Sequence, residues 1–181
     1  MSFLKSNPQA SLPDVLRQYP ELAGPLFQIG ETLMRGPSAL SEGERELIGA
    51  YVSFLNGCHF FMDVHGHAAE RFGLDRRILE QLKGTEQPDG FGDQRISLFR
   101  YIRRLNDSPG DIVQEDADAV LDKGWDENAL VNAVVLCGFF NLMNRWVNGL
   151  GIPADHEVTE KLGQMLHDKG YAAVADMVRS M

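Results

Sequence analysis

The residues with the clearest chemical potential are a cysteine, a histidine and a glutamate in the first half of the chain. Cys58 and His65 are seven positions apart, which on a helix places two side chains on one face, two turns apart. Glu46 precedes Cys58 by twelve positions. A thiol, an imidazole and a carboxylate are the components of a proton relay that activates a sulfur nucleophile. The spacing therefore predicts thiol chemistry, provided that the fold brings the three groups together.

The helix expected to carry the thiol spans about Gly57 to Arg71 and has an apolar face that holds Cys58, Phe61 and His65. We expect Asn56 to cap this helix, which would leave Cys58 near its second position. The dipole and the free N–H groups of a helix start favour a thiolate. The alternative is structural, because a cysteine on an apolar stripe usually serves packing and a histidine there is usually a satisfied core residue.

Glu46 belongs to the preceding helix, which a capping box of Ser41 and Glu44 is expected to start. The apolar face of that helix is centred on residues such as Leu47 and Tyr51, and Glu46 points nearly opposite. The periodicity favours a solvated surface glutamate. The alternative is a helix buried on both sides, with Glu46 aimed into a pocket.

Helical patterns cover nearly the whole chain, and no strand alternation is visible. Pro20 and Pro25 are expected to break residues 13–35 into two short helices. The longest apolar helix is expected from Glu127 to about Asn148, and such a helix lies centrally or in an oligomer interface. We expect an all-α fold, a compact bundle of about seven to nine helices, with residues 1–181 as one domain.

The bulk composition excludes several function classes. A net charge of −9 argues against a nucleic-acid partner, because phosphates would be repelled. No run of 18 or more apolar residues and no signal-peptide layout is visible, so we expect neither a membrane span nor a membrane partner. Two cysteines do not make a disulfide framework in a chain of 181 residues. We therefore expect a cytoplasmic protein.

Residues 41–72 resemble the core of the alkyl hydroperoxidase D-like (AhpD-like) and carboxymuconolactone decarboxylase superfamily. Its Glu…Cys-x-x-Cys-x-x-x-His motif is matched at Glu46, Cys58 and His65, and the segments 45–48 and 56–58 fit in residue type and spacing. Residues 140–145 are similar to the Phe-Asn-x-x-Asn-Arg signature of the peroxidase-related branch. The resemblance covers roughly residues 13–153, and it implies an AhpD-like fold and a homo-oligomer.

The resemblance also implies roles for single residues. Glu46 and His65 correspond to the groups that relay protons, and Cys58 corresponds to the resolving cysteine. Phe61 stands where the attacking cysteine would be, so a disulfide within the motif is impossible. A further relay histidine of some members falls at Phe60 and is absent. Cys137, the other thiol, lies on the apolar helix and is most simply a core residue.

Two further groups of residues need an interpretation. His59, Asp63 and His67 recur every four positions and could bind a divalent metal, but a solvated face is the favoured interpretation. We expect no metal site and no cofactor. Arg145 lies within an apolar helix, where it could pair with a buried carboxylate such as Glu46 or hold the carboxylate of a substrate. A purely structural ion pair is an equal alternative.

Three functions follow from these residues. The leading one is thiol-dependent reduction of a hydroperoxide, in which Cys58 forms a sulfenic acid, His65 and Glu46 shuttle protons, and an external thiol resolves the intermediate. The second is a decarboxylase-like reaction on a small organic acid, with proton transfer by the same pair and Arg145 on the carboxylate. The third is a non-catalytic binding protein in which Phe61 fills the reactive position and contacts the ligand.

Overall fold

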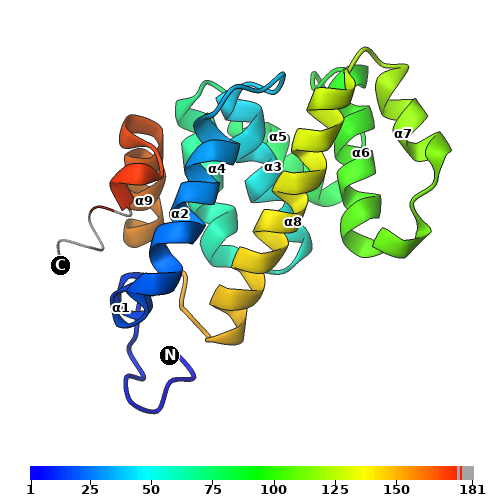
Figure 1. Ribbon diagram of the computed structural model, residues 1–181. Helices are drawn as coiled ribbons and strands as arrows, with labels where there is room; N and C mark the ends of the chain where they lie inside the picture. The colour runs from blue at the N-terminus through cyan, green and yellow to red at the C-terminus, as the bar shows by residue number, and fades with distance from the viewer. Residues whose placement is uncertain (175, 177–181) are drawn as a thin grey trace.

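Nine α-helices and one short 3-10 helix make up most of the described part of the chain, residues 1–174 and 176, in this computed structural model (Figure 1). No strand occurs among those residues, so the prediction of an all-α fold with about seven to nine helices is confirmed. The helices are α1 (Leu12–Gln18), α2 (Pro20–Arg35), α3 (Glu42–Leu55), α4 (His59–Arg71), α5 (Arg76–Gly84), α6 (Asp93–Asp107), η1 (Pro109–Asp111), α7 (Gln114–Leu121), α8 (Glu127–Gly149) and α9 (His156–Lys169).

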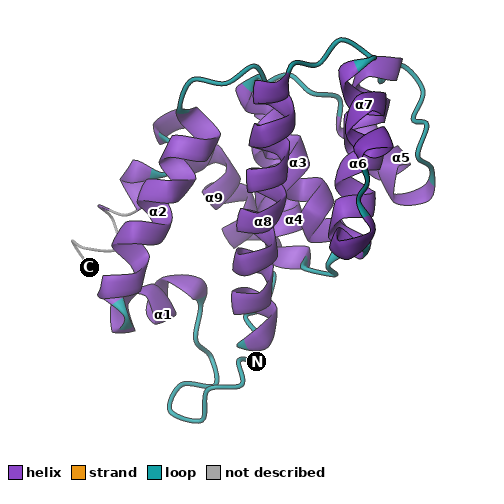
Figure 2. Cartoon of the chain, turned by 45° about the vertical axis from the view of Figure 1, so that its right-hand side comes forward, coloured by secondary structure: helices purple, strands orange, loops and turns teal. Residues whose placement is uncertain are grey.

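The helices are arranged around α3 and α4, which pack against each other along much of their length. α9 packs on α4, whereas α8 packs on α3 and on α6, and α6 contacts both α3 and α7 (Figures 1 and 2). α2 reaches both α3 and α8, and α1 lies against α2. The two central helices are the ones that carry Glu46 and His65, so both residues start from the middle of the molecule.

α3 is buried on every side, which decides the position of Glu46. All residues from Gly43 to Ser53 are buried. Gly49 permits the close approach of α8, because a Cβ atom there would overlap the ring of Phe140. The interpretation of Glu46 as a solvated residue is therefore wrong. Periodicity alone could not show that a second layer of helices covers the polar side of α3.

The starts of α2 and α3 follow their local sequence signals. The capping box at the start of α3 is confirmed, with Ser41 Oγ 3.2 Å from the backbone N–H of Glu44 and the Glu44 carboxylate 2.9 Å from that of Ser41. The segment 13–35 does form two helices, but only Pro20 divides them, and Pro25 lies inside α2. Pro20 is tolerated at the first position of α2, because the N–H that it lacks would have no partner within the helix.

The expected cap of α4 is wrong. Asn56 ends α3 and its side chain bonds to Asn141 and Asn106, whereas Cys58 itself is the N-cap residue of α4. Cys58 contributes no side-chain capping bond; its backbone N–H donates to the carbonyl of Ser53 at 2.8 Å. The thiol is thus one step outside the helix rather than within its first turn.

α8 is apolar on its outer side as well as its inner side. Val131, Val135 and Leu142 are 57%, 45% and 51% exposed. The sequence predicts no membrane span, yet by length and composition α8 could cross a membrane; the core helix of a soluble protein can have the same length and composition. Since α8 packs along both α3 and α6, the core position is the simpler explanation.

Candidate functional site

Glu46 and His65 form a hydrogen-bonded pair at the α3–α4 contact. His65 Nδ1 lies 2.6 Å from Glu46 Oε2, and the side chains are fully buried or nearly so. Each residue occupies the face of its helix that meets the other helix. The carboxylate and imidazole of the predicted relay are therefore brought together by the packing of two adjacent helices.

Two residues that the sequence analysis did not identify complete the surroundings of Glu46. Arg35, the last residue of α2, donates from Nη2 to Glu46 Oε1 at 2.6 Å and to the carbonyl of Leu166 at 2.8 Å. Tyr171, which follows α9, donates its hydroxyl to the Glu46 carboxylate, 3.2 and 3.3 Å from the two oxygens. A buried carboxylate with three donors is satisfied without water.

The protonation of this cluster follows from its charges. Burial alone would raise the pKa of Glu46, but the hydrogen bond from His65 and the positive charge that its ring carries when protonated, together with Arg35, outweigh burial and lower it. Burial and the nearby Glu46 charge raise the pKa of Tyr171 well above 10. An ionised carboxylate only accepts hydrogen bonds, so the shared proton resides on His65 Nδ1. In the neutral ring, the free lone pair is then on Nε2.

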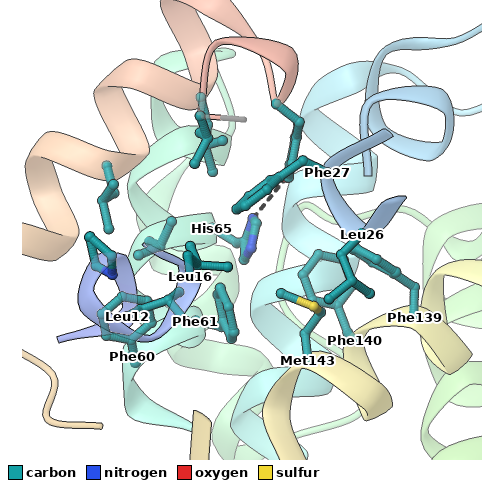
Figure 3. Close-up of a pocket in the computed structure, with 16 residues that line it drawn as sticks. Leu12, Leu16, Leu26, Phe27, Phe60, Phe61, His65, Phe139, Phe140 and Met143 are labelled. Carbon is teal, nitrogen blue, oxygen red and sulfur yellow. Dashed lines mark hydrogen bonds between the residues drawn. The ribbon is translucent and has the colours of Figure 1, made fainter. Parts of the chain in front are cut away.

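His65 also lines an apolar cavity of about 50 Å³. Figure 3 shows its ring among Leu16, Phe61 and Phe140. The Phe61 ring is stacked at 5.6 Å and the Phe140 ring meets it edge-on at 4.6 Å. Within the described chain, His65 Nε2 has no hydrogen-bond partner, and His65 and Tyr171 are the cavity residues with nitrogen or oxygen in their side chains. The imidazole therefore joins a buried charge cluster to an apolar space.

Cys58 is not part of this arrangement. Its side chain is fully buried, it does not line the cavity, and no hydrogen bond connects it to His65 or Glu46 in the described part of the protein. Burial raises the pKa of the Cys58 thiol more than the backbone N–H groups of Phe61 and Phe60 lower it. The thiol is held protonated, contrary to the expectation from its place at a helix start.

Of the two residues predicted to bind a substrate, one lies at the cavity and the other does not. Phe61 lines the cavity. Arg145 is exposed on α8 and donates to the backbone and side chain of Asn141. It neither lines the cavity nor pairs with Glu46, and Arg35 makes that ion pair instead. The expectation of Arg145 as a partner of Glu46 is therefore wrong.

The remaining candidates lie outside the site. Cys137 is buried on α8, where burial raises the pKa of its thiol to about 11. His59 is exposed, but His67 is buried against α9 with its ring edge-on to His156. The prediction that His59, Asp63 and His67 form a solvated face is therefore only partly correct. Within residues 1–174 and 176, no three histidine, cysteine or acidic side chains form a group that could hold a metal ion.

Sequence signals for Arg35 and Tyr171 were weak. A basic residue in the last turn of a helix is common because it complements the helix dipole. Tyr171 follows the end of α9 and lies beyond the segment that resembles the family. Gly170 before it has φ +71°, the kind of turn signal that marks where a chain re-enters the structure.

Comparisons with known proteins agree with the fold and with the central helices. Residues 20–103, which include Arg35, Glu46 and His65, match the carboxymuconolactone decarboxylase family. The chain is 24% identical to an uncharacterized protein, YdfG, of Bacillus subtilis over 108 residues, 60% of this chain and 74% of that protein.

Two solved structures share the fold. An uncharacterized peroxidase-related protein from Silicibacter sp. TM1040 superposes with a TM-score of 0.72 at 23% identity, covering 80% of this chain and 77% of that one. A peroxidase-related protein from Ralstonia eutropha JMP134, described as an alkylhydroperoxidase AhpD core, gives 0.75 at 19% identity, covering 83% and 78%. Residues 20–103 thus match the carboxymuconolactone decarboxylase family, and the chain has the fold of these two peroxidase-related proteins.

Proposed function

We propose that the protein is an enzyme that moves a proton on a small molecule bound in the apolar cavity, with His65 as the acid–base group and Glu46 as its partner. One observation carries the proposal: His65 Nδ1 is fixed on Glu46 at 2.6 Å while the same ring lines the cavity. A general base must reach the substrate with a free lone pair, and this tautomer leaves Nε2 for that purpose.

The proton balance of such a step is simple. Nε2 removes a proton from an acidic C–H or O–H of the substrate, and the electron pair stays on the substrate. The imidazolium formed is stabilised by the Glu46 carboxylate, which is ionised and already in contact with it. Return of the proton to another atom of the substrate regenerates His65, so the reaction class is isomerisation or another proton-transfer step at carbon.

Thiol-dependent hydroperoxide reduction by Cys58 is the second candidate. It is supported by the names of the similar structures and by the backbone N–H groups of Phe60 and Phe61 that face the sulfur. In this reaction the thiolate would attack the peroxide, release an alcohol and become a sulfenic acid, which an external thiol would reduce. Burial of Cys58 and the raised pKa of its thiol weigh against it.

The test compares three variants with two matched controls. Candidate ketones and lactones are incubated with protein in deuterated water, and NMR follows exchange of their acidic C–H protons. We expect His65→Gln and Glu46→Gln to abolish exchange, on the order of a hundredfold or more, while Cys58→Ser keeps it. His59→Gln, an exposed histidine on the same helix, and Cys137→Ser are the controls.

A parallel assay mixes the same proteins with cumene hydroperoxide and a dithiol. Peroxide reduction that disappears in Cys58→Ser but survives in Cys137→Ser would establish the second candidate instead. Proton exchange that continues at the wild-type rate in His65→Gln would refute the first.

The outer side of α8 supports a homo-oligomer as part of the proposal. Val131, Val135 and Leu142 are exposed on this one helix, and contiguous apolar surface commonly marks an association site. Sedimentation velocity should show a lower mass for Leu142→Glu, and an unchanged mass for Val158→Glu, a change at an exposed valine on α9. A cytoplasmic location, where two free thiols stay reduced, completes the proposal.

A further inference from the structure

The charge balance of the site indicates which ligands it can accept. Glu46 is neutralised by Arg35 at 2.6 Å, and both groups lie behind His65 rather than in the cavity wall. Among the described residues that line the cavity, none carries a permanent charge. A carboxylate in this space would lose its hydration without gaining a cation, which is strongly unfavourable. The cavity therefore selects an uncharged ligand.

The size of the cavity sets a second condition. Its volume is about 50 Å³, whereas an apolar cavity of roughly 150 Å³ is known to hold benzene. Besides His65, the described side chain that both lines this space and contacts Glu46 is Tyr171. Withdrawal of that side chain would add the volume of a phenol ring directly beside His65.

The contacts of Tyr171 resemble those of a bound ligand. Its hydroxyl donates to Glu46 and lies 3.3 Å from His65 Nδ1. Its ring is parallel to the imidazole, within 9°, and the Arg35 guanidinium lies 5.2 Å from the ring centroid. A substrate that reached the Glu46–His65 pair from this side would have to replace these contacts.

The backbone around Tyr171 is held by one removable interaction. The Glu31 carboxylate accepts the N–H groups of Tyr171 and Ala172 at 2.7 and 3.0 Å. Gly170, at φ +71°, connects this short segment to the end of α9. Gly30 leaves room for the ring, since a Cβ atom there would lie 3.0 Å from Tyr171 Cδ1. Glu31 thus fixes Tyr171 without taking part in the Glu46–His65 pair.

We propose that the ligand of this site is an uncharged planar molecule with a hydroxyl group, of the phenol or enol class, and that it binds by replacing the side chain of Tyr171. The inference rests on the proposed role of the His65–Glu46 pair. The hydroxyl would donate to Glu46 as Tyr171 does, and the planar frame would lie between the imidazole and the apolar wall. An enol presents its oxygen and its adjacent carbon to the same acid–base group.

The experiment measures binding of three probes of similar size: phenol, toluene and benzoate. NMR titrations follow the ring signals of His65 in the wild type, in Glu31→Ala and in Glu21→Ala, a matched control at an exposed glutamate of the same helix. Release of Tyr171 raises the fraction of protein with an open site, so phenol should bind Glu31→Ala about tenfold more tightly than the wild type. Glu21→Ala should match the wild type.

The probes separate the parts of the inference. Toluene lacks the hydroxyl and benzoate is charged, so each should bind Glu31→Ala about tenfold or more weakly than phenol does. Equal phenol affinity in Glu31→Ala and the wild type, no phenol binding in either, or benzoate binding as tightly as phenol would each overturn the proposal. His65→Gln, in which binding is followed by the ring signals of phenol itself, distinguishes the two proposals, because it should lose proton transfer and still bind phenol through Glu46.

Discussion

His65 on α4 and Cys58, the N-cap residue of α4, are both buried, yet their surroundings differ in kind. His65 touches an ionised carboxylate on one side and an apolar cavity on the other. Cys58 lies at the N-terminal end of the same helix, where its sulfur meets backbone N–H groups and no relay side chain within the described residues. Seven residues of helix correspond to about 10 Å along the axis. Sharing a helix face is therefore insufficient to couple the two groups.

Phe61, which lies between Cys58 and His65 in the sequence, contributes to the chemical difference between their surroundings. Phe61 stacks on the His65 ring and lines the cavity, so the position between Cys58 and His65 in the sequence is filled by a side chain that cannot exchange protons. The end of α4 that carries His65 has the features of a reaction site, while the end that carries Cys58 has those of a core. Four predictions test this contrast, from the largest expected effect to the smallest.

Removal of the Glu46 carboxylate should have the largest effect. Glu46→Ala removes the close partner of the buried Arg35, which keeps only a 4.0 Å contact with Glu42, and leaves His65 Nδ1 without its carboxylate acceptor. Breaking a buried ion pair in this way costs about 3–5 kcal/mol. Urea unfolding followed by circular dichroism measures the loss.

The matched control is Glu44→Ala, two positions away, which removes the capping-box carboxylate and its pair with Arg95. It should cost about 1 kcal/mol. Similar losses for the two variants would mean that the buried cluster contributes no more than a helix cap.

Lowering the pH should remove the stability that the Glu46 carboxylate contributes. The folded pKa of Glu46 is lowered from the ordinary 4.5, because its contacts with His65 and Arg35 outweigh burial. Its contribution to stability is present above the unfolded pKa of 4.5 and is lost as pH falls through the lower folded value. Urea midpoints measured across this range should fall more steeply in the wild type than in Glu46→Gln. Parallel curves would show that Glu46 is not ionised in the folded protein.

Much of this arrangement could be predicted from sequence, and the failures have physical causes. The all-α fold and the start of α3 follow from periodicity and from a capping box that needs only four adjacent residues. Glu46 was misplaced because a helical wheel shows one apolar face and cannot show that a second layer covers the other. The motif spacing correctly paired Glu46 with His65, since that pairing depends on two neighbouring helices.

Long-range contacts could not be predicted in the same way. Arg35 and Tyr171 meet at Glu46 from segments 136 positions apart, and neither has a local signal for that role. Arg145 sat in a family-like signature on an apolar helix, yet it lies on the exposed side of α8, bonded to Asn141. Which side of a helix faces solvent depends on the helices around it.

Restoring the thiol at position 61 tests whether the contrast depends on that one side chain. Phe61→Cys should cost about 3 kcal/mol through the cavity that it leaves, and the new sulfur would lie three positions from Cys58, next to His65. We expect the variant to consume cumene hydroperoxide and to form an internal disulfide, seen by mass spectrometry as the loss of two hydrogens. The double variant Cys58→Ser with Phe61→Cys is the control and should form none. A single variant that stays reduced would show that the family motif alone does not produce peroxidase chemistry here.

Truncation of the native thiol should have the smallest effect. Cys58→Ala removes one buried sulfur atom that contacts no relay group and costs about 1 kcal/mol. Cys137→Ala removes an equally buried thiol from α8 and should behave alike. Proton exchange on the substrate should be unchanged in both, because neither sulfur lines the cavity. If Cys58→Ala alone lost activity, the sulfur would have to reach the substrate through a motion that opens the start of α4, and the two ends of the helix would work as one site.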